Sequence, residues 1–232
     1  MSLEVYHKAR WAYRLGRRCK ALELCRSVSF DKTDFLAAKI LLSGPHYTEV
    51  LRRAHEAIQP AVYIEIGIDE GSTLRLAHPG TQVIGIDPCP KLTAPAGANT
   101  KIFRMTSDEY FATNSSPLAQ MAFIDGMHQF EYALRDFQNL EHTMHPRGTL
   151  FVHDVVPLDE RTATRERKTA FWSGDVWRFL LILRDHRPDL RVEVLNCPPT
   201  GLARITNLNP HYTWPAIDVD RYLKTGFDER IR

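Results

Sequence analysis

Short runs of apolar and β-branched residues recur through the middle of the chain, and most of them have an acidic residue near or just after their end. The runs are Ala61–Ile66, Thr81–Ile86, Lys101–Met105, Met121–Ile124 and Gly148–Val152. Such runs are typical of strands that are buried on both faces of a sheet. Helical patterns follow two of them, one from Thr106 and one from about Phe130 to Met144. Strands that alternate with helices predict a parallel sheet with right-handed crossovers.

The two ends of the chain depart from this central pattern. Residues 1–58 carry helical patterns and no strand signal, and we expect a helical N-terminal extension that serves as a lid or a dimer contact. Near the other end, Arg191–Leu195 and Leu202–Thr206 flank a turn with prolines and a glycine, which predicts an antiparallel hairpin. The expected fold is α/β, with a doubly wound, mostly parallel seven-stranded sheet in a domain of residues 59–232.

A glycine turn follows the first run. Gly67 and Gly71 interrupt the pattern, and residues 72–77 then read as the start of a helix. Glycine allows a tight turn and a close approach of the backbone to a ligand. The free N–H groups of a first helical turn would point at that ligand. The stretch therefore predicts a nucleotide cradle.

Acidic residues lie at or just after the ends of four predicted strands. Glu65, Asp87 and Asp125 belong to three of them, and His153 with Asp154 follows the fifth run. Because ligands bind at the carboxyl ends of parallel strands, these side chains are expected to share one site.

The spacing of these residues limits the kind of nucleotide. There is no GxxxxGK[ST] motif, and Gly67 with Gly71 does not form GxGxxG, so neither a P-loop nor a dinucleotide fingerprint is present. Asp87 follows Glu65 at roughly 20 residues, where a second-strand carboxylate can bind a ribose diol. Two acids beside the turn suit a cationic, ribose-bearing ligand.

Composition narrows the function further. The chain has 232 residues, is 44% hydrophobic and 25% charged, and has a net charge of +2. That charge argues against nucleic-acid binding by bulk electrostatics. No apolar run could span a bilayer, the N-terminus lacks a signal-peptide core, and the four cysteines show no zinc spacing. We therefore expect a cytoplasmic protein without a nucleic-acid or membrane partner.

The stretch Arg10–Arg18 is basic, with interleaved aromatic residues. It could form a patch for an acidic ligand or a membrane surface. We favour a solvated helix face on which Trp11 and Tyr13 pack against the domain or a second subunit. The aromatic N-terminal helices therefore suggest a homodimer.

The motifs at the strand ends resemble those of class I S-adenosylmethionine-dependent methyltransferases. The glycine turn, Asp87 and the run Phe123-Ile124-Asp125-Gly126 carry this resemblance. The longer pattern from Phe123 to Tyr132, with Asp136, Gly148, His153-Asp154, Pro157 and Gly174–Trp177, is similar to the bacterial group of macrocin-type O-methyltransferases and cephalosporin-hydroxylase-like proteins. The resemblance covers roughly residues 60–208 and implies a Rossmann-like fold.

The resemblance also implies roles for the cofactor-binding residues. The turn with Gly67, Gly71 and Ser72 would approach the methionine part of S-adenosylmethionine, and Glu65 would lie beneath it. Asp87 would bind the ribose hydroxyls. The residues placed near the cofactor further along the chain are Ser107, Asp108 and Asp125.

The chemistry is expected on the far side of the same site. Methyl transfer to a hydroxyl of a small molecule, such as a sugar or secondary metabolite, needs a base that takes the proton. His128 is the first candidate, with Asp125, His153 and Asp154 as others. The related enzymes often hold a divalent cation, for which Asp125, His153 and Asp154 offer ligands, although His153 and Asp154 could instead bond to each other.

Three further features of the sequence leave alternatives open. The charged segment 155–170 reads either as a loop over the strand ends or as a solvated surface loop. Phe171, Trp172 and Trp177 could line an acceptor pocket or pack in the core. A metal-dependent oxygenase or hydroxylase, or a non-catalytic binding module, is the alternative to the methyltransferase on this scaffold.

Overall fold

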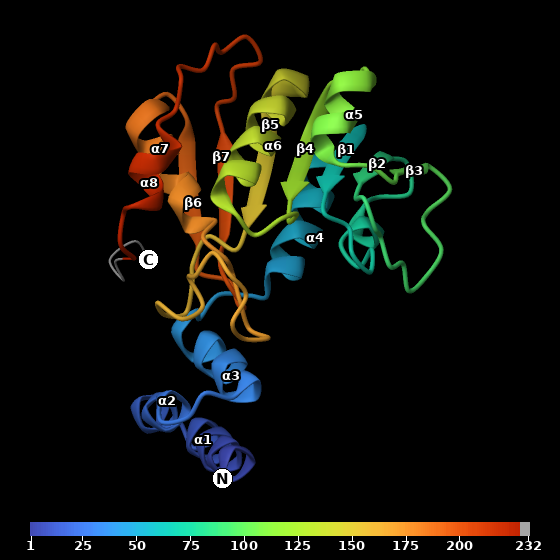
Figure 1. Ribbon diagram of the computed structural model, residues 1–232. Helices are drawn as coiled ribbons and strands as arrows, with labels where there is room; N and C mark the ends of the chain where they lie inside the picture. Colours follow the sequence, from blue (N-terminus) through green and yellow to red (C-terminus); the bar gives the residue numbers. More distant parts are fainter. Residues whose placement is uncertain (228–232) are drawn as a thin grey trace.

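The computed structural model describes residues 1–227 and contains one seven-stranded sheet with helices on both faces (Figure 1). The last residues of the predicted domain, 228–232, lie outside this range. The strands are β1 (Val62–Ile66), β2 (Gln82–Ile86), β3 (Thr100–Phe103), β4 (Ala119–Ile124), β5 (Met144–His153), β6 (Arg191–Leu195) and β7 (Leu202–Thr206). Their order across the sheet is β3-β2-β1-β4-β5-β7-β6.

The direction of the strands agrees with the sequence analysis. β1 to β5 are parallel, whereas β7 runs antiparallel to both β5 and β6. The expected α/β fold, a mostly parallel seven-stranded sheet with a C-terminal antiparallel hairpin, is confirmed.

Alternate strand residues face two layers of helices. Ile64 of β1 belongs to the core beneath α5 (Ser107–Thr113), α6 (Phe130–Thr143), α7 (Trp177–His186) and α8 (Val219–Leu223). Its neighbour Tyr63 faces the opposite core, which α4 (Tyr47–Ile58) covers with Leu51. Because both faces are covered, the strands read as continuous apolar runs.

The expected helix after the glycine turn is wrong. The structure has only a 3₁₀ turn, η1 (Leu74–Leu76), between β1 and β2. Pro79 and Gly80 follow closely and lead directly into β2, so too few residues remain for a stable α-helix. The N–H groups of a helical first turn are therefore not part of this site.

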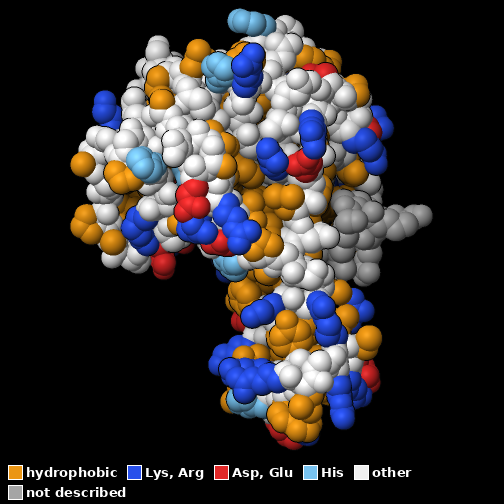
Figure 2. Space-filling model, turned by 180° about the vertical axis from the view of Figure 1, so that it is seen from behind, with side chains coloured by type: hydrophobic (Ala, Val, Ile, Leu, Met, Phe, Trp, Pro, Cys, Tyr) orange, Lys and Arg blue, Asp and Glu red, His pale blue; other side chains and the backbone are white. Residues whose placement is uncertain are grey.

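The N-terminal helices α1 (Ser2–Arg14), α2 (Arg18–Arg26) and α3 (Asp31–Leu41) form a lobe that projects beyond the carboxyl ends of the strands (Figures 1 and 2). Small buried side chains, including Ala9, Ala21 and Ala38, let the three helices pack closely. Helix α4 instead packs on the sheet, so the part of residues 1–58 that stands apart is α1–α3. None of the helices among the described residues has the length and hydrophobicity to cross a bilayer.

Candidate active site

A cavity of about 890 Å³ opens at the carboxyl ends of β1, β2, β4 and β5. Most of the predicted site residues line it. They are Gly67, Ser72, Asp87, Ser107, Asp108, Asp125, His128, His153 and Asp154. The other two predicted residues, Glu65 and Gly71, are not among its lining residues. The topology therefore brings the strand-end acids to one site, as the sequence analysis expected.

The glycine turn is shaped by the chain that packs against it. Gly67 has a φ of +83°, and a Cβ there would lie 2.1 Å from the carbonyl oxygen of Asp125. Gly71 has a φ of +71°, and a Cβ there would lie 2.7 Å from Leu92 Cδ2. At Gly67, only glycine fits both the conformation and the close approach of the β4–α6 loop, so Gly67 lets the loops after β1 and β4 come together. Gly71 supplies a second left-handed position in the turn, next to Leu92 of the β2–β3 connection.

Asp87 holds this turn with its carboxylate. Its Oδ2 accepts hydrogen bonds from the backbone N–H groups of Ile68 (2.8 Å) and Asp69 (3.1 Å), and its Oδ1 accepts one from Cys89 (2.7 Å). A carboxylate has about four acceptor positions, so three amides leave it some capacity toward the cavity. Asp87 therefore stabilises the turn through its hydrogen bonds and also lines the cavity.

Glu65 is fully buried beneath the turn. Its carboxyl group accepts hydrogen bonds from the hydroxyls of Tyr63 (2.7 Å) and Thr73 (2.5 Å). Burial raises the pKa of Glu65 to about 8, although both hydrogen bonds lower it. Glu65 therefore supports the turn from below and is mainly protonated at neutral pH.

This raised pKa predicts a pH-dependent stability that Glu65→Gln removes. Between pH 4.5 and about 8 the native state keeps a proton on Glu65 that the unfolded chain has lost. The stabilisation is thus fully present below pH 4.5 and is lost as the pH rises through about 8, by up to about 1.4 kcal/mol per pH unit. Denaturant unfolding at several pH values should show wild type weakening relative to Glu65→Gln over this window. Parallel curves for the two proteins would contradict the assignment.

The loop after β3 forms another wall. Thr106 caps α5 in a capping box with Glu109. Ser107 donates a hydrogen bond to the buried carboxyl of Asp136 (2.5 Å), while Asp108 pairs with Arg135 (2.9 Å). Burial raises the pKa of Asp136 to about 7. Asp136, which the sequence analysis quoted only as part of a motif, thus joins Ser107 and Asp108 at this end.

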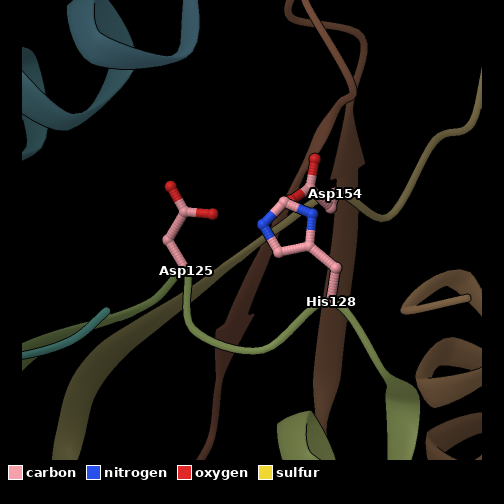
Figure 3. A group of neighbouring side chains, drawn as sticks. All are labelled: Asp125, His128 and Asp154. Carbon is pink, nitrogen blue, oxygen red and sulfur yellow. The ribbon is translucent and has the colours of Figure 1, made fainter. Parts of the chain in front are cut away.

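At the other end, one imidazole lies between two carboxylates (Figure 3). His128 Nδ1 is 3.2 Å from Asp154 Oδ2, and ligand atoms of Asp125, His128 and Asp154 all lie within 4.8 Å of one another. Despite this distance, His128 Nδ1 and Asp154 Oδ2 have no aligned hydrogen bond to each other or to another group. Burial raises the pKa of Asp154, even though His128 and His153 lower it. The cluster thus presents two unsatisfied polar atoms that face each other.

His153 is engaged on both sides of its ring. Its Nδ1 lies 3.1 Å from Asp125 Oδ1 and its Nε2 lies 3.3 Å from Thr200 Oγ1. Burial lowers the pKa of His153, but the carboxylates of Asp125 and Asp154 raise it overall to about 9. The ring of Tyr47 lies against it at a centroid distance of 4.1 Å. At neutral pH His153 is therefore a buried imidazolium. The predicted metal ligands were Asp125, His153 and Asp154. The side chains whose ligand atoms lie close together are instead Asp125, His128 and Asp154.

A corner of the 155–176 segment fixes the loop that carries His128. Gly174 has a φ of +65°, and a Cβ there would lie 1.8 Å from the carbonyl oxygen of His128. The N–H of Asp175 donates to that same oxygen (3.2 Å), and Asp175 Oδ1 accepts from the N–H of Phe130 (3.1 Å). Trp172 stacks on the His128 ring at 5.0 Å. The Gly174–Asp175 corner is thus a support for His128, whereas Trp177 is buried in the core.

Several lining residues come from parts of the chain that the sequence analysis did not connect with the site. They are Phe35 of α3, Tyr47 of α4, and Pro199 with Thr200 of the β6–β7 turn. Phe35 packs edge-on against Phe171, and Arg161 bridges to Asp34 at 3.3 Å, so α3 is attached to the 155–176 segment. The lobe therefore contributes to the cavity wall.

Comparisons with known proteins agree with this geometry. Residues 64–155 match the model of a methyltransferase domain family. No curated protein matches the sequence. Nothing in the comparisons supports an oxygenase or hydroxylase.

Solved structures share the fold at low sequence identity. Cofactor-bound Rv0187 from MTB has 19% identity and a TM-score of 0.57 over 75% of this chain and 88% of its own. An O-methyltransferase from Bacillus cereus in complex with SAH has 13% identity and a TM-score of 0.53 (70% and 80%). The O-methyltransferase TomG from Streptomyces achromogenes, in complex with SAM, has 16% identity and a TM-score of 0.50 (69% and 78%).

The family match spans β1 to the end of β5, which are the strands that supply the acids of the cavity. The fold shared with the solved structures covers a larger part of the chain, up to 75% of it. The chain is therefore similar to a methyltransferase domain over residues 64–155, on a fold that it shares with solved O-methyltransferases.

Proposed function

We propose that this protein transfers a methyl group from S-adenosylmethionine to a hydroxyl oxygen of a small molecule. The observation that carries the proposal is the placement of His128. Its imidazole lines the same cavity as the glycine turn and Asp87, and it faces the buried carboxylate of Asp154. A base beside the cofactor cradle is what a hydroxyl acceptor requires, because the oxygen must lose its proton during the transfer.

The residues at one end of the cavity fit the cofactor. Asp87 keeps acceptor capacity for ribose hydroxyls, and Ser107, Asp108 and Asp136 offer polar atoms beyond it. The turn with Gly67 and Ser72 forms the intervening wall, supported from below by Glu65. When bound, S-adenosylmethionine supplies an electrophilic methyl group on a sulfonium.

At the other end, the protein's own groups handle the acceptor. His128 Nδ1 faces Asp154, which leaves Nε2 to take the proton of the acceptor hydroxyl. The Asp154 carboxylate stabilises the resulting imidazolium through its charge. His153 holds Asp125 in place and has no free nitrogen, so we assign it a positioning role.

The same cluster also fits a divalent cation. Asp125, His128 and Asp154 offer two carboxylate oxygens and one imidazole nitrogen, and the unsatisfied His128 Nδ1 and Asp154 Oδ2 would both gain a partner. A cation held there would lower the pKa of an acceptor hydroxyl. The cation would occupy the His128 nitrogen that faces Asp154. We therefore treat a cation mechanism as an alternative to the His128 base, and removal of metal by a chelator distinguishes the two.

Two measurements test the proposal. Calorimetry should show S-adenosylmethionine binding, and absence of binding at about 1 mM cofactor would exclude a cofactor site of useful affinity. A panel of sugars, phenols and other hydroxylated metabolites should then yield methylated product in mass spectrometry. Turnover that survives extensive chelation supports His128 as the base, whereas turnover that disappears and returns with added Mn²⁺ or Zn²⁺ supports the cation. The resemblance to macrocin-type O-methyltransferases stays a prediction, which the panel of acceptors tests.

A further inference from the structure

The outer face of α1 carries large apolar side chains that contact little of this chain. Leu3, Trp11 and Leu15 are 49%, 62% and 50% exposed. Leu3 and Trp11 are eight residues apart and lie on the same side of the helix, and Leu15, the residue that caps α1, follows Trp11 by four. Tyr13 packs within the lobe, whereas Trp11 is largely exposed on this chain, and its packing against a second subunit stays a prediction. About half or more of each of these side chains is therefore open to solvent in the single chain.

The same lobe concentrates positive charge. Residues 1–27 contain seven Lys and Arg but only two Glu, although the whole chain has a net charge of only +2. Both acids are already paired, Glu4 with Lys8 and Glu23 with Lys20. Within residues 1–227, this leaves five arginines of the segment without an acidic partner: Arg10, Arg14, Arg17, Arg18 and Arg26. Figure 2 shows the lobe with Lys and Arg side chains interleaved with hydrophobic ones.

We propose that this face of α1 binds the surface of an anionic lipid membrane. Leu3, Trp11 and Leu15 supply apolar area and an interfacial indole. Arg10 and Arg14, seven and eleven residues after Leu3, lie on its side of the helix and supply charge for acidic headgroups. Such a helix lies on the membrane without crossing it, with its small buried residues Ala9 and Ala12 packed on the protein side. The proposal revises the expectation of no membrane partner, and it does not depend on the proposed methyl transfer.

Charge decides against the other occupants of this face. A symmetric dimer through α1 would bring two strongly basic lobes together, which costs Coulomb energy. A nucleic-acid backbone would satisfy the arginines but would leave Leu3 and Leu15 exposed to water. An anionic membrane surface uses the apolar and the basic groups together.

Vesicle cosedimentation of the full chain tests the proposal. Wild type should bind vesicles with about 30% phosphatidylserine at least tenfold more tightly than vesicles of phosphatidylcholine alone, and about 0.5 M salt should weaken this binding. The double variant Arg10→Gln/Arg14→Gln should lose roughly tenfold in partitioning. Leu15→Ser and Trp11→Ser should each lose at least about threefold.

Matched controls remove the same groups from other surfaces. Arg184→Gln/Arg191→Gln removes two exposed charges from the sheet domain, and Leu118→Ser removes a leucine that is 54% exposed. Both should bind vesicles as wild type does. Circular dichroism should show that every variant keeps its helices.

Three outcomes would overturn the proposal. The first is no binding to anionic vesicles, and the second is equal loss in the controls and the α1 variants. The third is a dimer in light scattering that Trp11→Ser converts to a monomer, which would assign the face to a second copy of the chain.

Discussion

Replacing His128 by alanine is expected to lower the turnover number of methyl transfer by roughly 10²- to 10⁴-fold, the usual contribution of a general base. The affinity for S-adenosylmethionine should stay unchanged, because the groups proposed to hold the cofactor are the turn at Gly67 and Asp87 and do not include His128. Calorimetry with the cofactor and initial rates with the best acceptor of the panel measure the two quantities separately.

Two companion variants show whether the imidazole acts as a base. Added imidazole should restore part of the rate of His128→Ala, since it can enter the space that the side chain leaves beside Trp172. His211→Ala, which removes an exposed histidine outside the cavity, should behave as wild type. A His128→Ala rate within about threefold of wild type would refute the base and pass the role to another group of the cluster.

The sheet was predictable because burial on both faces leaves a clear mark in the sequence. Mostly apolar runs such as Ala61–Ile66 and Met121–Ile124 are typical of strands that are buried on both faces of a parallel sheet. The missing helix after β1 shows the limit of the same reasoning. Residues 72–77 have an acceptable helical pattern, but Pro79 and Gly80 end it after one 3₁₀ turn. The connection between β1 and β2 is too short for an α-helix, although the local sequence favours one.

Only those features of the site that follow from the sheet topology alone could be predicted from the sequence. Strand ends converge, so Asp87, Asp125 and Asp154 could be assigned to one edge of the sheet. The orientation of a ring depends on partners that are distant in the sequence. The ring of His153 contacts Thr200 and Tyr47, which lie in the β6–β7 turn and in α4. No local pattern marks either of these residues.

Replacing Asp87 by alanine is expected to weaken S-adenosylmethionine binding at least tenfold, which corresponds to about 1.4 kcal/mol. The carboxylate has two functions that alanine removes together. It accepts three backbone hydrogen bonds that fix the turn at Ile68 and Asp69, and it is the acceptor proposed for the ribose hydroxyls. Calorimetry gives the affinity, and thermal unfolding without cofactor gives the contribution to the fold.

The variant Asp87→Asn separates these two functions. Its amide oxygen can still accept hydrogen bonds from Ile68 and Asp69, but its NH₂ group cannot accept one from Cys89 or from a ribose hydroxyl. If Asp87 binds ribose, Asp87→Asn should lose much of the cofactor affinity while it recovers part of the stability that Asp87→Ala loses. Wild-type affinity in both variants would remove Asp87 from the cofactor site. A loss in Asp87→Ala alone would mean that Asp87 acts only through the turn that Gly67 begins, and that the ribose is held by other residues of the cavity.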